Sequence, residues 1–79
     1  MPIEFDKHRG VFRGVVTVEE AETLLEWLQS EPSAKVDLSP CSHLHTANVQ
    51  VLMAAKNVVE EWPKDSDLRA WLQTALKSA

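Results

Sequence analysis

Hydrophobic and polar residues alternate along this chain with two different periods, which predict strands in some segments and helices in others. Residues 3–6 and 11–16 are short runs rich in β-branched and aromatic side chains, separated by a polar stretch. This arrangement is typical of two strands joined by a turn. Gly14 interrupts the second run, which indicates a bulge or a close approach of the backbone. Residues 35–39 alternate with Val36 and Leu38 on one side, and they predict a third strand.

Three further segments carry apolar residues three and four positions apart, the spacing of one face of a helix. The first helix is expected to begin at Thr17, because Thr17 and Glu20 form a capping box, and to end at Glu31 and Pro32. The second is predicted over about 47–60, and a third follows the capping residues at 65–67. The apolar stripe of the third helix consists of Leu68, Trp71, Leu72, Ala75 and Leu76.

The order of elements is therefore β-β-α-β-α-α, and it predicts an α/β fold. The second strand, first helix and third strand form a crossover unit, so these two strands should be parallel neighbours. We expect a small sheet of three to four strands with helices packed on it. Residues 62–65 leave no room for another strand before the last helix, so the third strand is expected at an edge of the sheet. Trp62 would cover this edge or a second subunit would pair with it, which makes a homodimer an expectation.

Length and charge exclude several classes of protein. At 79 residues and 8.9 kDa, the chain has room for a single domain, residues 1–79, since domains typically hold about 100–150 residues. The net charge is −4 and the cations are scattered, so no nucleic-acid partner is expected. Cys41 is the single cysteine, which favours a reducing cytoplasmic location. The apolar runs are too short for a membrane span.

The segment 36–56 combines a strand, a loop over residues 40–46 and the start of the second helix. In open α/β sheets, ligands gather at the carboxyl ends of the strands. A helix N-terminus adds free amides and a partial positive charge that suit a phosphate. Thr46 lies at this point and also suits the helix N-cap.

This segment resembles the STAS domain family, the bacterial anti-sigma factor antagonists and their relatives. The shared features are a strand ending in Asp-Leu-Ser at 37–39, a loop closing with Leu-His-Thr-Ala-Asn at 44–48 and a helix reading Val-Gln-Val-Leu at 49–52. With the upstream order of elements, the resemblance spans roughly residues 3–60. In that family the loop closes in Asp-Ser-Ser-Gly, and the first Ser is phosphorylated by a partner kinase. Thr46 occupies that position here, with His45 for the Asp, Ala47 for the second Ser and Asn48 for the Gly.

The resemblance implies a regulatory protein–protein interaction module rather than an enzyme, with no cofactor. Its partner would be a kinase-type anti-sigma factor or a similar signalling protein, docked on the loop 40–46 and the start of the second helix. Thr46 would be the phosphorylation site, because a phosphate there adds nearly two negative charges at a helix N-terminus. The candidate partner-binding residues are Ser39, Ser42, His43, His45, Thr46 and Asn48.

Other interpretations remain beside this one. A scaffold or subunit of a larger complex would keep the fold without the phosphorylation switch. Cys41, His43 and His45 alternate, and thiolate and imidazole are zinc ligands, although structural zinc sites usually space their ligands in pairs. A metal or small-ligand site is therefore a distant third interpretation. A nucleophile formed by a Cys-His pair is not expected, because no carboxylate or amide is evident to orient the histidine.

The glutamates at 19, 20, 22 and 26 indicate a solvated acidic face or, as an alternative, a surface for a basic partner.

Overall fold

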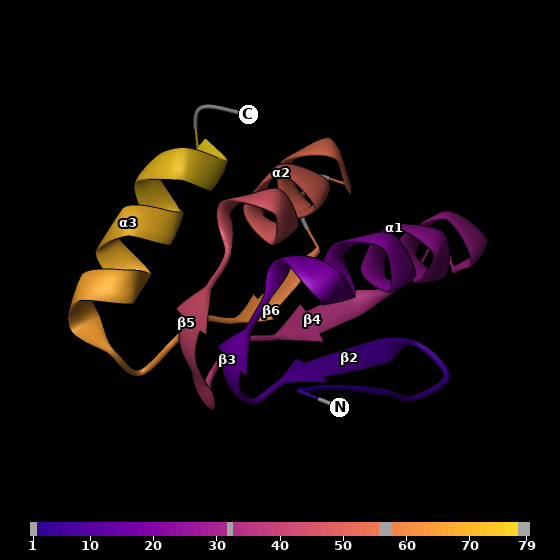
Figure 1. Ribbon diagram of the computed structural model, residues 1–79, viewed down its shortest axis with the longest axis horizontal. Coiled ribbons are helices and arrows are strands. Elements are labelled where there is room, and N and C mark those ends of the chain that lie inside the picture. The colour runs from indigo at the N-terminus through magenta and orange to yellow at the C-terminus, as the bar shows by residue number, and fades with distance from the viewer. Residues whose placement is uncertain (1, 32, 56–57, 78–79) are drawn as a thin grey trace.

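The computed structural model describes residues 2–31, 33–55 and 58–77 and shows an α/β fold, as predicted (Figure 1). Three helices lie on one side of the sheet, and α2 contacts both of the others. The strands are β1 (Ile3–Phe5), β2 (Arg9–Phe12), β3 (Gly14–Val16), β4 (Lys35–Asp37), β5 (Cys41–Leu44) and β6 (Val59–Glu61). The helices are the 3₁₀ turn η1 (Val18–Glu20), α1 (Ala21–Ser30), α2 (Thr46–Ala55) and α3 (Ser66–Lys77).

The main sheet has the strand order β1-β2-β4-β6. Strand β1 is antiparallel to β2, while β4 is parallel to both β2 and β6. The parallel pairing of the strands on either side of the first helix confirms the predicted crossover unit. Gly10 of β2 pairs with Val36 of β4, so the two strands place their buried residues on the same face of the sheet.

Strands β3 and β5 form a second, parallel sheet of two strands. It extends the β2–β4 pair beyond a break, where the Gly14 amide donates a hydrogen bond of 2.9 Å to the Pro40 carbonyl. Gly14 has a φ of +63°, a conformation that suits glycine, and the register shifts between Gly14 and Val15. The predicted irregularity at Gly14 is therefore confirmed.

Two elements differ from the sequence prediction. Residues 41–44, expected within a loop, form strand β5. Helix α2 ends at Ala55, and residues 59 and 60, expected at the end of this helix, belong with Glu61 to strand β6. Positions 56–57 of the predicted helix, like Pro32 after the first, lie outside the described residues. Val36 donates to the Val58 carbonyl and Leu38 to the Glu61 carbonyl. The expectation that no strand precedes the last helix is therefore wrong, and β4 lies inside the sheet rather than at its edge.

The hydrophobic core lies between the sheet and the helices. Trp27 of α1 is half-buried and packs on Phe5, with ring centroids 4.9 Å apart, and on Gly10. Trp71, expected in the core, is instead 44% exposed, because it lies at the border of the stripe centred on Leu68 and Leu72. The buried core residues include Ile3, Phe12, Val16, Leu24, Val36, Leu38, Cys41, Leu44, Val49, Leu52, Leu68 and Leu72.

The first helix begins at the predicted capping residues. The Glu20 carboxylate accepts hydrogen bonds from the Thr17 amide, at 3.0 Å, and from the Thr17 hydroxyl, at 2.6 Å. The Glu20 amide bonds to the Thr17 carbonyl. The predicted capping box of Thr17 and Glu20 is present, and the helix opens as the 3₁₀ turn η1, which continues into α1.

Candidate functional site

Strand β5 presents two of the predicted site residues to solvent. Cys41 and Leu44 at its ends are buried in the core, whereas Ser42 and His43 between them are exposed. His43 pairs with Val15 of the parallel strand β3, and Val15 is 55% exposed. These residues form an exposed surface to which the two strands contribute side by side.

His45, not Thr46, caps the start of α2. The His45 Nδ1 accepts a hydrogen bond of 3.0 Å from the Ala47 amide, and its carbonyl accepts the Asn48 amide at 2.9 Å. The His45 amide itself donates to the Val16 carbonyl at the end of β3. The capping role predicted for Thr46 is therefore wrong, because the cap comes from the His45 ring.

Thr46 is the first residue of α2 and its side chain is exposed. The cap that its hydroxyl was expected to supply comes from the neighbouring imidazole. A group attached to the Thr46 hydroxyl would therefore lie at the N-terminus of a ten-residue helix, where the helix dipole favours negative charge.

Asn48 is fully buried, so its predicted place on the binding surface is wrong. Its Nδ2 donates a hydrogen bond of 2.7 Å to the Thr17 carbonyl, which joins the first turn of α2 to the residue before η1. Its Oδ1 is buried and has no hydrogen-bond partner among the described residues. Asn48 therefore positions α2 and does not offer a surface to a partner.

Ser39 holds the turn between β4 and β5. Its amide and hydroxyl donate hydrogen bonds of 2.9 and 2.7 Å to Asp37 Oδ1, and the serine is half-buried. Burial acts to raise the pKa of Asp37, but the hydrogen bonds from Ser39 and the charges of Arg9 and Arg13 outweigh it and lower that pKa. Ser39, a candidate partner-binding residue, therefore has its amide and hydroxyl bonded within the turn, and the Asp37 carboxylate is their acceptor.

The proposed metal ligands are not arranged as a metal site. Cys41 is buried, and its Sγ donates a hydrogen bond of 3.4 Å to the His43 carbonyl. Burial raises the pKa of the Cys41 thiol despite this contact, which disfavours the thiolate that binds metals. Across the part of the chain that the structure describes, no group of three or more His, Cys, Asp and Glu side chains is placed to hold a metal ion.

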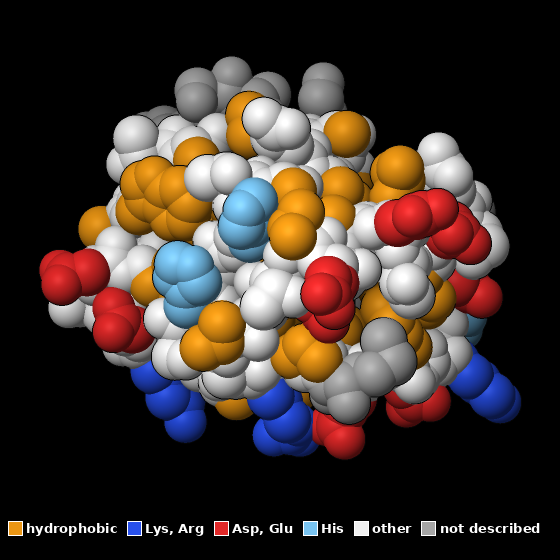
Figure 2. Space-filling model, in the orientation of Figure 1, with side chains coloured by type: hydrophobic (Ala, Val, Ile, Leu, Met, Phe, Trp, Pro, Cys, Tyr) orange, Lys and Arg blue, Asp and Glu red, His pale blue; other side chains and the backbone are white. Residues whose placement is uncertain are grey.

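Of the predicted site residues, four are exposed: Ser42 and His43 in β5, His45 between β5 and α2, and Thr46 at the start of α2. Histidine side chains lie among hydrophobic ones on the face of the molecule seen in Figure 2. The sequence prediction missed Val15, although its position between Gly14 and the buried Val16 was a signal that it would point to solvent.

Comparison of the chain with protein-family models, curated proteins and solved structures finds no match. The resemblance to the STAS family therefore stays a prediction from the sequence. Within residues 2–31, 33–55 and 58–77, no helix has the length and apolar character needed to cross a membrane.

Proposed function

We propose that this protein is a cytoplasmic regulatory module that binds a signalling protein through the surface formed by Ser42, His43, His45 and Thr46. One observation carries the proposal: each of these four side chains is exposed in the short segment where β5 leads into α2, and this segment resembles the STAS family. Exposed Val15 beside His43 adds apolar area to this surface. Mixed apolar and polar side chains of this kind suit a protein interface.

Phosphorylation of Thr46 would switch this binding. The hydroxyl is accessible at the helix N-terminus, where a phosphate is favoured by the dipole and changes the surface by nearly two charges. The partner would then be a kinase-type anti-sigma factor or a related signalling protein. His45 lies next to this position, and its Nε2, which takes no part in the cap, is free to donate a hydrogen bond to a phosphate.

An interaction module suits the geometry better than an enzyme does. The groove between α1 and α2 is lined by Leu, Val and Ala side chains and by Gln29, which offer no nucleophile or general base. The unmodified scaffold is the second candidate function, and it is favoured by one observation: His45 occupies the position before Thr46 that is acidic in the STAS family.

Site-specific photocrosslinking in the source cells tests the binding surface. A crosslinker placed at Ser42 or His43 should capture one defined protein, whereas the same crosslinker at Glu61, an exposed residue of β6, should not. Recombinant partner should then bind the wild-type chain and lose affinity for His43→Glu. Equal capture from both faces, or unchanged affinity of His43→Glu, would contradict the proposal.

The switch is tested separately by intact mass after incubation with the captured partner and ATP. A mass increase of about 80 Da, absent from Thr46→Ala, is expected if Thr46 is phosphorylated. Thr46→Glu should then weaken partner binding. If the mass does not change and Thr46→Glu binds the partner as tightly as wild type, the switch is contradicted and the scaffold function is supported instead.

A further inference from the structure

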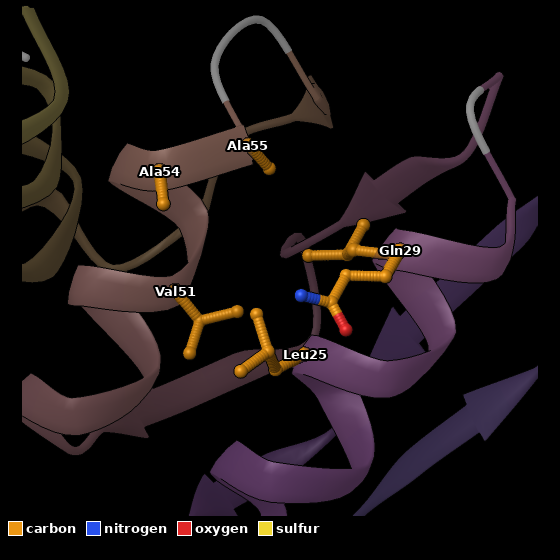
Figure 3. Close-up of a pocket in the computed structure, with 6 residues that line it drawn as sticks. Leu25, Gln29, Val51, Ala54 and Ala55 are labelled. Carbon is orange, nitrogen blue, oxygen red and sulfur yellow. The ribbon is translucent and has the colours of Figure 1, made fainter.

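A second surface lies between α1 and α2, where their side chains leave an open apolar groove. Its volume is about 170 Å³, and it is lined by Leu25, Leu28, Gln29, Val51, Ala54 and Ala55. Leu25 and Val51 point toward each other across it (Figure 3). The alanines of α2 are too short to fill the space, so Leu25 remains 39% exposed. None of the residues of the proposed binding surface, Ser42, His43, His45 and Thr46, lines this groove.

The helix that forms one wall of the groove is acidic. Glu22 lies one turn before Leu25, and Glu26 follows it, so the helical period places both carboxylates on the solvent side of the groove wall. Both glutamates are exposed. Neither η1 nor α1 contains a Lys or Arg, and the described part of α2 carries no charged residue; Lys56, which follows it in the sequence, lies outside the described residues.

Two arginines of the described chain lie in or just after strand β2 and are paired with carboxylates. Arg9 lies on the sheet and pairs with Asp37 and Glu60, and Arg13 pairs with Glu4. Figure 2 shows the visible Lys and Arg side chains along the lower edge of the molecule, on the side of the sheet in Figure 1. The apolar groove thus borders a helix that carries Glu22 and Glu26 and that itself contains no Lys or Arg.

We propose that the groove between α1 and α2 binds a cationic amphipathic helix of a protein partner. The apolar stripe of such a helix would bury Leu25 and Val51, and its Lys or Arg side chains would lie over Glu22 and Glu26. The same carboxylates repel nucleic acid and anionic membranes. They also disfavour a second copy of this chain packed through the same face, because its glutamates would meet these ones.

The probe is an 18-residue peptide of Leu and Lys with helical amphipathic spacing, titrated into ¹⁵N-labelled protein. A peptide of the same composition in scrambled order is the control for charge alone. We expect amide shifts concentrated at Leu25, Gln29 and Val51, and binding at least about tenfold tighter than for the scrambled peptide, a difference that equilibrium titration resolves readily. The affinity should fall as salt screens the carboxylates.

Matched variants locate the two parts of the interaction. Leu25→Ser should weaken peptide binding at least about tenfold, whereas Val15→Ser, a change at an exposed apolar residue of the other surface, should not. Glu22→Gln with Glu26→Gln should weaken binding more than Asp6→Asn with Glu61→Gln, which removes the same charge from exposed positions outside the helices. Thr46→Glu should leave peptide binding unchanged, so this proposal can fail or succeed independently of the proposed switch.

Several results would overturn it. If the two double charge variants lost the same peptide affinity, or if the scrambled peptide bound as tightly as the amphipathic one, the affinity would come from net charge alone. Sedimentation showing a dimer that Leu25→Ser dissociates would assign the groove to a second copy of the chain. Binding to phosphatidylglycerol vesicles that Leu25→Ser abolishes would assign it to a membrane surface.

Discussion

The Asn48 side-chain amide donates a 2.7 Å hydrogen bond to the carbonyl of Thr17, which lies 31 residues earlier in the chain. The bond joins the first turn of α2 to the residue whose amide and hydroxyl are held by Glu20 at the start of η1. Because Asn48 is fully buried, this contact fixes the N-terminus of α2, and with it Thr46, relative to the first helix.

Asn48→Ala should therefore destabilise the protein by about 1–3 kcal/mol, because it leaves the Thr17 carbonyl without its buried donor. Urea denaturation measures the change in free energy of unfolding. Gln50→Ala, at an exposed position of the same helix, is the matched control and should stay within about 0.5 kcal/mol of wild type. Equal stability of the two variants would show that the Asn48 contact does not hold the helix.

This contact also shows where sequence reasoning reaches its limit. The start of the second helix near Thr46 was predictable from the local pattern. The burial of Asn48 was not, because its partner lies on another element. The cap at His45 was missed because N-cap preferences favour the neighbouring threonine over histidine.

The strands that were missed have related causes. In β5 the two buried residues, Cys41 and Leu44, are three positions apart, since the register shift beside Gly14 breaks the strict alternation by which strands are identified. At the start of β6, the pair Val58 and Val59 fits a helical stripe as well as a strand. The strand forms because the buried amides of Val36 and Leu38 need hydrogen-bond acceptors. The carbonyls of Val58 and Glu61 supply them.

A second prediction separates the roles of His45 and Thr46. His45→Ala removes the acceptor of the Ala47 amide and should destabilise the protein by about 1 kcal/mol, a typical cost of losing an N-cap. Thr46→Ala should change the free energy of unfolding by less than about 0.5 kcal/mol, since Thr46 is exposed and does not cap the helix. If urea denaturation showed a larger loss of stability for Thr46→Ala than for His45→Ala, Thr46 would be the cap.

A third prediction concerns acid. The pKa of Asp37 in the folded protein lies below the ordinary value of 3.8, so its ionised form stabilises the fold. This contribution is fully present above the unfolded pKa and is lost as pH falls through the folded pKa. Asp37→Asn should therefore be less stable than wild type at pH 7, and the difference should shrink below pH 3.8. Glu61→Gln, at an exposed residue, is the control; a difference for Asp37→Asn that stays constant with pH would contradict this account.

The fourth prediction compares the two glycines, which differ in why they are needed. At Gly14 a methyl group would meet no atom within 4 Å, but φ is +63°, so Gly14→Ala should cost about 1–2 kcal/mol through backbone strain alone. At Gly10 the methyl group would lie 3.2 Å from the Trp27 ring, so Gly10→Ala must displace the indole. Both variants should lose stability in urea, but only Gly10→Ala should shift the tryptophan emission of the folded state. A shifted emission in Gly14→Ala would mean that the break between β2 and β3 also governs how α1 packs on the sheet.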